Sequence, residues 1–212
     1  MIMNKLRDFS EPSLREAVRV VRAGGVIAFP TETFYGLGAC PFNAHAVQRI
    51  FDLKGRALRG APILVLIRSR TELEALTTEI TPIAERLMET YWPGPLTLVF
   101  RASDSVPSIL TAGTGTIGIR LSAHADVQRL LAAVGGPLTG TSANRSGHPP
   151  AATADDVDGA LGTDVDVILN GGETPGGLSS TVVDTTVIPP RLVREGRIPK
   201  ASLLSIIDSW AA

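Results

Sequence analysis

The chain has 212 residues, of which 44% are hydrophobic and 19% charged; this composition fits one sizeable globular domain and excludes a disordered chain. Its 20 Lys and Arg residues nearly balance its 21 Asp and Glu residues, so the net charge of −1 excludes a general attraction to nucleic acids or anionic membranes. Any site for an anion must therefore be a local cluster of cations.

The single cysteine, Cys40, excludes an intramolecular disulfide and a cysteine-rich zinc site, and we interpret it as a small core residue. The first ten residues carry Lys5, Arg7 and Asp8 and lack the apolar segment of a secretory signal. The longest apolar run, residues 63–67, is too short to cross a bilayer. We therefore expect a cytoplasmic protein without a membrane partner.

Helix-like and strand-like segments alternate along the chain. Apolar residues recur at helical spacing from Leu14 to Val21 and predict a first helix that ends at the glycine pair 24–25. Asn43 and Thr81 are favourable N-caps for later helices. We expect helices to begin near residues 12, 43, 81, 126, 153 and 199. We expect strands at residues 26–29, 63–67, 96–100, 116–121, 138–141, 165–169, 180–184 and 191–194.

These elements predict a single α/β domain over residues 1–212. Because some strands are joined by helices and others by turns, we expect a mixed sheet flanked by helices rather than a purely parallel sheet. Neither G-x-G-x-x-G nor G-x-x-x-x-G-K-S/T follows a predicted strand, so the sequence supports neither a Rossmann nor a P-loop nucleotide site.

Polar residues gather in a segment that follows the first buried strand. Residues 29–38 combine hydroxyl groups, a carboxylate and glycines, and glycine lets the backbone approach a ligand closely. Thr31 and Thr33 could orient the polar groups of a ligand. The alternative is a strand-to-turn segment in which the threonines serve as strand formers and caps.

Cations cluster directly after the second predicted helix. Lys54, Arg56 and Arg59 fall within six residues and form a reasonable phosphate cradle, since Arg offers a fork of donors and Lys a point charge. The alternative is a solvated basic loop.

Arg120 lies in an otherwise apolar strand, where an arginine rarely lacks a partner. That partner is either a structural carboxylate or the carboxylate of a ligand. Thr116 lies two pleats earlier on the same face of the strand.

Two later segments are rich in small polar residues. Thr141, Ser142 and Asn144 end a strand and enter a loop that could hold phosphate oxygens, although a simple Asx or Ser turn would look the same. Ser180 begins a strand after a glycine-rich turn, and Arg194 follows; alone this pattern is weak. The three histidines lack the spacing of metal ligands, so we predict no metal site made of side chains.

Together these segments closely resemble the YrdC/Sua5 family of threonylcarbamoyl-AMP synthases, from about residue 14 to residue 199. The order and spacing of six motifs carry the resemblance. The motifs are Pro30-Thr-Glu-Thr with Tyr35-Gly-Leu-Gly, Lys54-x-Arg56, Gly118-x-Arg120, Ser142-x-Asn144, Ser180-Thr-Val-Val-Asp184 and Arg194-x-Gly196.

The resemblance implies a twisted YrdC/RibB-like sheet with a basic concave cleft, and a nucleotidyltransferase activity. Such enzymes condense L-threonine, bicarbonate and ATP into threonylcarbamoyl-AMP and pyrophosphate. A separate transferase then moves the threonylcarbamoyl group to adenosine 37 of tRNA, so tRNA is only an indirect partner.

The resemblance also implies roles for individual residues. The ATP site, with Mg²⁺ on the phosphates, would comprise Lys54, Arg56, Thr116, Ser142, Asn144 and Arg194, of which Lys54 and Arg56 would be catalytic. Arg120 would pair with the threonine carboxylate. The rest of the threonine site would comprise Thr31, Thr33, Thr141 and Ser180.

The chain departs from the family pattern after Arg56. Ala57 replaces the usual proline, and residues 58–63 differ from the more common small polar run that borders the expected amino-acid pocket. The C-terminal domain of the long branch is not found before residue 212, which implies the short, single-domain branch.

Three alternatives remain. Related domains transfer carbamoyl groups in hydrogenase-maturation proteins, but those carry cysteine-rich zinc fingers and this chain has one cysteine. A pI of about 6.3 and 5% aromatic residues argue against an RNA-binding module. A paralogue with different or weak activity is kept open by the altered residues 57–62.

Overall fold

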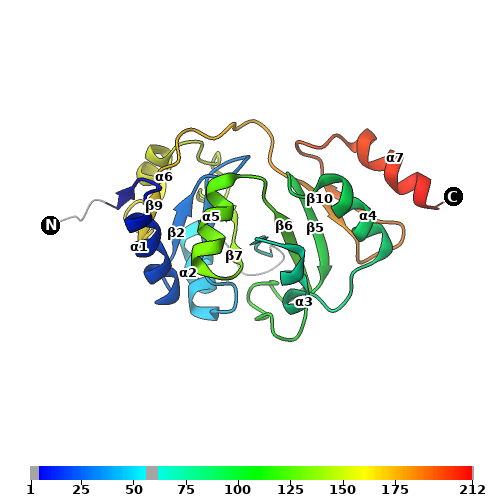
Figure 1. Cartoon of the computed structure of the whole chain (residues 1–212), viewed down its shortest axis with the longest axis horizontal. Coiled ribbons are helices and arrows are strands. Elements are labelled where there is room, and N and C mark those ends of the chain that lie inside the picture. Colours follow the sequence, from blue (N-terminus) through cyan, green and yellow to red (C-terminus); the bar gives the residue numbers. More distant parts are fainter. Residues whose placement is uncertain (1–4, 56–61, 212) are drawn as a thin grey trace.

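The computed structural model describes residues 5–55 and 62–211, and its strands form two sheets (Figure 1). The first sheet has the order β1 (Leu6–Arg7), β9 (Val167–Leu169), β2 (Ile27–Phe29), β3 (Gly36–Gly38) and β8 (Thr141–Ser142). The second has the order β11 (Arg191–Arg194), β10 (Thr181–Asp184), β5 (Leu96–Arg101), β6 (Thr116–Leu121), β4 (Val65–Ile67) and β7 (Leu138–Thr139).

The predicted mixed α/β class is confirmed, because each sheet contains parallel and antiparallel pairs. In the first sheet β2 runs parallel to β9 and antiparallel to β3. In the second, β5 runs parallel to β10 and antiparallel to β6. The expectation of one sheet is corrected to two, since strand propensity says which segments are extended but not how they divide between sheets.

The change of sheet occurs at Gly140. The single strand predicted over residues 138–141 is interrupted there: β7 pairs with β4 in the second sheet, and β8 pairs with β3 in the first. The backbone N–H of Gly140 donates to the carbonyl of Leu64 at 2.7 Å. A Cβ at Gly140 would lie 2.6 Å from Cγ of Leu66, so only glycine allows the chain to cross this closely.

The helices surround the two sheets, with α1 and α7 at opposite ends of the molecule (Figure 1). Asn43, Thr81 and Thr153 cap their helices through their side chains, which confirms three predicted helix starts. The helices are α1 (Glu11–Arg22), α2 (Ala44–Lys54), η1 (Arg70–Glu72), α3 (Leu73–Leu76), α4 (Pro82–Tyr91), α5 (Ala125–Val134), α6 (Ala154–Leu161) and α7 (Lys200–Ala211).

The core consists of two clusters of mainly aliphatic side chains, as the low aromatic content predicts. One cluster joins α1 and α5 to the first sheet, and Cys40 packs against it. The elements β1, β3 and α3 were not predicted, because they are very short or rich in glycine. Over residues 5–55 and 62–211, no helix combines the length and hydrophobicity needed to cross a membrane.

Candidate active site

A cavity of about 310 Å³ opens between the two sheets and collects most of the predicted site residues. Strands β3 and β8 contribute to its wall from the first sheet, and β5, β6, β10 and β11 contribute from the second. The predicted residues that line it are Thr31, Thr33, Lys54, Arg120, Thr141, Ser142, Ser180 and Arg194. Residues up to 163 positions apart in the sequence thus converge on one site, between Thr31 and Arg194.

Among the predicted residues that the structure describes, two are not part of this lining. Asn144 lies behind it and contacts Lys54. Thr116 pairs with Arg101 at the start of β6, and its hydroxyl contacts Thr114 at 2.9 Å. A strand rises by about 3.3 Å per residue, so Thr116 lies far along β6 from Arg120 even though both share one face. Arg56 lies outside the described residues.

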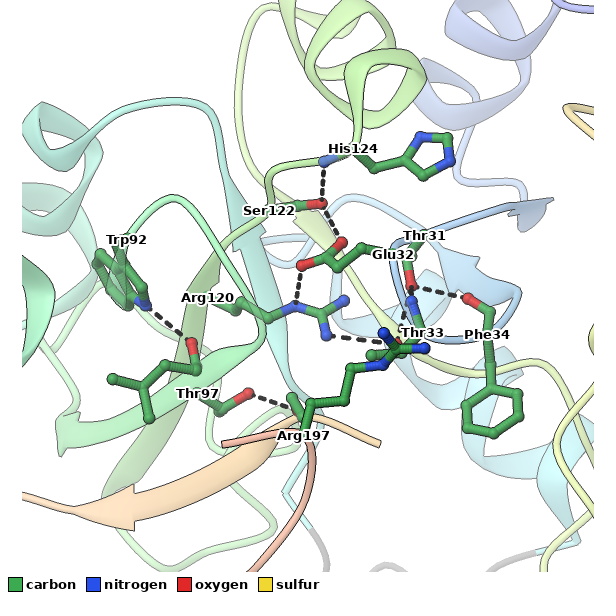
Figure 2. A network of polar contacts seen from close by, with 12 residues as sticks. Thr31, Glu32, Thr33, Phe34, Trp92, Thr97, Arg120, Ser122, His124 and Arg197 are labelled. Carbon is green, nitrogen blue, oxygen red and sulfur yellow. Dashed lines mark hydrogen bonds and ion pairs between the residues drawn. The ribbon is translucent and has the colours of Figure 1, made fainter. Parts of the chain in front are cut away.

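Arg120 is almost completely buried, with 2% of its surface exposed. Its Nε lies 3.7 Å from Oε1 of Glu32, and its Nη1 lies 3.5 Å from Oγ1 of Thr33 (Figure 2). Desolvation lowers the pKa of the guanidinium, Glu32 opposes this by raising it, and the nearby charge of Arg194 lowers it further. Neither Nε of Arg120 nor Oε1 of Glu32 has a hydrogen-bond partner among the described residues.

From the sequence, the partner of Arg120 could be a structural carboxylate or the carboxylate of a ligand. In the structure, the structural carboxylate of Glu32 lies at ion-pair distance. That carboxylate does not satisfy the guanidinium, whose donors beyond Nε point toward Thr33 in Figure 2. A buried arginine at a cavity wall is well suited to bind an anion. Glu32 was not singled out from the sequence, because nothing in its local pattern indicates its distant partner.

Arg194 brings a second guanidinium to the cavity from β11. Its Nε and Nη2 donate to the carbonyl of Ser180 at 3.2 and 2.9 Å. The residue as a whole is exposed, but partial desolvation of the guanidinium lowers its pKa. The Ser180 hydroxyl lies 2.9 Å from that of Thr97, a buried residue the sequence did not indicate, since a threonine in a strand is usually only a strand former.

Lys54 is buried at the end of α2, with 4% of its surface exposed. Its Nζ donates to the carbonyl oxygens of Ser142 and Asn144 at 2.7 and 3.1 Å, and to Oδ1 of Asn144 at 3.0 Å. The Ser142 hydroxyl donates to the same Oδ1 at 2.6 Å. The ammonium therefore holds the turn that follows β8, a positional role that local sequence could not indicate.

The cavity thus combines guanidinium and ammonium groups with hydroxyl groups from several strands. No group of three His, Cys, Asp or Glu residues that could hold a metal ion is found in the part of the chain that the structure describes. His124 precedes α5 without a side-chain cap, and its buried Nδ1 has no hydrogen-bond partner among those residues. The arrangement is suited to binding small anions that also carry polar groups.

Comparisons with known proteins cover nearly the whole chain. Residues 19–196 match the model of the Sua5/YciO/YrdC family, which carries the description "Telomere recombination". Threonylcarbamoyl-AMP synthase of Pyrococcus abyssi is 40% identical over 207 residues, which are 98% of this chain and 61% of that protein. The chain therefore spans less than two thirds of the length of this relative.

Solved structures show the same similarity in three dimensions. The structure of P. abyssi Sua5 complexed with L-threonine is 39% identical, with a TM-score of 0.89, over 98% of this chain and 61% of that chain. Escherichia coli YciO is 31% identical, with a TM-score of 0.81, over 91% of this chain and 93% of that chain. The second match shows the fold along almost the full length of both proteins.

Proposed function

Because this chain belongs to the Sua5/YciO/YrdC family, we propose that it is a threonylcarbamoyl-AMP synthase. It would condense L-threonine, bicarbonate and ATP into threonylcarbamoyl-AMP and pyrophosphate. One observation carries the proposal: Arg120 and Arg194, from different strands, line one cavity together with Thr33 and Ser180. A carboxylate and a set of phosphates are the anions that such a site would hold side by side.

The chemistry requires positioning more than a strong base. Threonine and bicarbonate form a carbamate with loss of water, and a carbamate oxygen attacks the α-phosphorus of ATP. The bond from the α-phosphorus to the bridging oxygen breaks, and pyrophosphate leaves with the electron pair. Negative charge grows on the phosphate oxygens, so fixed cations and oriented donors supply most of the help.

Arg120 is the proposed partner of the threonine carboxylate. It is buried, and it lines the cavity beside Thr33. Thr33 and Ser180 would orient the amino acid, with Thr31 and Thr141 in the same pocket. The existence of an L-threonine complex of P. abyssi Sua5, which shares this fold, supports the assignment.

The remaining cations are proposed to act on ATP. Arg194 and Lys54 line the same cavity, and Arg56 follows two residues after Lys54 in the sequence. Ser142 would contact the nucleotide directly. Asn144, for which we infer a supporting role, and Lys54 hold the Ser142 turn in place. Thr116, which was also predicted to belong to the ATP site, does not line the cavity.

Mg²⁺ would accompany ATP: the described lining offers hydroxyl groups and no cluster of carboxylates, so the ion would rely mainly on ligands from ATP itself. Glu32, a carboxylate beside the cavity, is already engaged with Ser122 and Arg120, so it is not proposed as a metal ligand. The ion would neutralise part of the phosphate charge. We propose that the product passes to a tRNA threonylcarbamoyl transferase in the cytoplasm, and that tRNA is a partner only through that enzyme.

The proposal is tested by incubating the protein with ATP, Mg²⁺, bicarbonate and one amino acid at a time, and measuring pyrophosphate. We expect release that depends on both threonine and bicarbonate, with threonylcarbamoyl-AMP identified by mass. Release without amino-acid preference would contradict threonine selectivity and favour a paralogue of different activity. RNA binding without turnover would contradict the proposal altogether.

A further inference from the structure

The carboxylate of Glu32 links Arg120 to a buried hydroxyl. One of its oxygens, Oε1, lies 3.7 Å from Nε of Arg120, and the other, Oε2, accepts a hydrogen bond from the Ser122 hydroxyl (Figure 2). Ser122 has no exposed surface, and the Glu32 side chain is 16% exposed. Glu32 thus contacts the Nε side of the guanidinium and leaves its other donors on the cavity side.

The direction of the Ser122 hydroxyl is fixed by its neighbours. The backbone N–H of His124 donates to Oγ of Ser122 at 3.2 Å, so the hydroxyl hydrogen is free to point at Glu32. His124 is the N-cap residue of α5. A chain of contacts therefore runs from the start of α5 through Ser122 and Glu32 to Arg120, and the positive end of the helix dipole favours a carboxylate there.

A tight turn delivers Glu32 and Thr33 to the same guanidinium. Oγ1 of Thr31 accepts from the N–H of Thr33 at 3.2 Å and donates to the carbonyl of Phe34 at 2.8 Å. This closed turn places Glu32 against Nε of Arg120 while Thr33 lies near Nη1 (Figure 2). Two sides of the guanidinium are therefore defined by consecutive residues.

We propose that Glu32 is a positioning residue for carboxylate recognition: braced by Ser122, it holds Arg120 with its outer donors facing the cavity. The inference rests on the proposed function and deepens it. The cavity holds the cations Arg120 and Arg194, and Glu32 balances one of them. Glu32 contacts Nε alone, so the Nη donors of Arg120 are left for a ligand carboxylate, while Arg194 remains for ATP.

The test is the isosteric variant Glu32→Gln, which removes the charge and turns an amide toward Arg120 or Ser122. We expect threonine affinity, measured by calorimetry, to fall roughly 10- to 100-fold, as expected when a binding group is misplaced. ATP affinity should stay near the wild-type value. Glu16→Gln is the matched control, because Glu16 forms an ion pair with Arg7 away from the cavity. A purely electrostatic role predicts the opposite sign, since a more positive cavity would bind threonine more tightly.

L-Threoninol, which lacks the carboxylate, separates positioning from general damage. We expect threoninol to bind more weakly than threonine to the wild-type protein. Its affinity should be the same for the wild-type protein and for Glu32→Gln. Ser122→Ala keeps the charge of Glu32 but removes the brace, so it should weaken threonine binding in the same direction and to a smaller extent. This second variant keeps the inference testable even if Glu32→Gln folds poorly.

The possible failures are distinguishable. Wild-type threonine affinity in folded Glu32→Gln, or equal losses for threonine and threoninol, would overturn the role of Glu32 while leaving the synthase proposal intact. If the wild-type protein neither binds threonine nor uses it for pyrophosphate release, the proposed function is wrong, and the inference built on it is overturned as well.

Discussion

Nζ of Lys54 lies 3.0 Å from Oδ1 of Asn144, although 90 positions separate the two residues in the sequence. The same ammonium donates to the backbone carbonyl oxygens of Ser142 and Asn144. A weaker contact of 3.5 Å joins the same Nζ to the Ser142 hydroxyl. One buried charge ties the last turn of α2 to the polar loop of the cavity.

Lys54→Met should therefore reduce stability as well as activity. The change keeps the apolar stem but leaves buried acceptors without their donor, which costs about 1–3 kcal/mol. We expect this loss in the free energy of unfolding measured with urea, together with a lower kcat. Lys5→Met is the matched control, because Lys5 also donates to a carbonyl, that of Thr163, but at an exposed site. Unchanged stability and turnover of Lys54→Met would contradict the role of the ammonium.

Arg120→Ala should act mainly on threonine. The pair that this change removes is the proposed one between Arg120 and the carboxylate of threonine. Loss of one partner of a buried, hydrogen-bonded charge pair costs about 2–5 kcal/mol, and here the loss should appear in the KM for threonine. The KM for ATP should change little. Arg101→Ala, at the exposed end of β5, is the control and should resemble wild type. An effect on ATP alone would show that Arg120 has been assigned to the wrong ligand.

Gly196→Ala should disturb the cavity wall through the backbone. A Cβ at Gly196 would lie 2.2 Å from the carbonyl oxygen of Ser179 and 2.6 Å from the carbonyl carbon of Ser180. The segment that carries the Ser180 hydroxyl must then move, at a cost of about 1–3 kcal/mol for overpacking.

We expect a lower Tm and weaker threonine binding for Gly196→Ala. Gly136→Ala is the control, because a Cβ at Gly136 meets no atom within 4 Å. Its Tm should stay at or slightly above that of wild type. Equal Tm values for the two variants would disprove the steric argument.

The start of α6 should show a defined pH dependence. Thr153 and Asp156 form a capping box, and hydrogen bonds from the Thr153 side chain and from the backbone of Thr153 and Ala152 hold the pKa of Asp156 below its usual value. A lowered folded-state pKa means that the stabilisation is present above the ordinary pKa of aspartate and is lost as the pH falls through the lower value.

Asp156→Ala should therefore lower the free energy of unfolding at pH 7 by about 0.5 kcal/mol, because Asp156 is exposed and solvent screens its interactions. The difference from wild type should shrink in acid, when the carboxylate becomes protonated. Asp155→Ala, in the same helical turn, is the control and should have a smaller effect, from the helix dipole alone. A difference that grows as the pH falls would contradict the assigned sign.

The sequence alone determined much of the local structure. The N-caps Asn43 and Thr81 and a helix start at Thr153 were predicted, because a capping side chain contacts a backbone N–H only a few positions away. The strand at residues 116–121 was predicted with its observed bounds, because the apolar pattern that indicates a strand depends only on residues next to one another in the sequence. Eight of the residues that line the cavity were among the site residues that the family resemblance implied.

Only the tertiary structure decided the rest. No local pattern reveals that the chain changes sheets at Gly140, that Lys54 holds the Ser142 turn, or that Glu32 and Ser122 brace Arg120. Side-chain periodicity reports which face of an element is buried, but not which distant element covers it. Contacts across 88 to 90 positions, such as those of Glu32 with Ser122 and of Lys54 with Ser142, exist only once the strands between them have been paired.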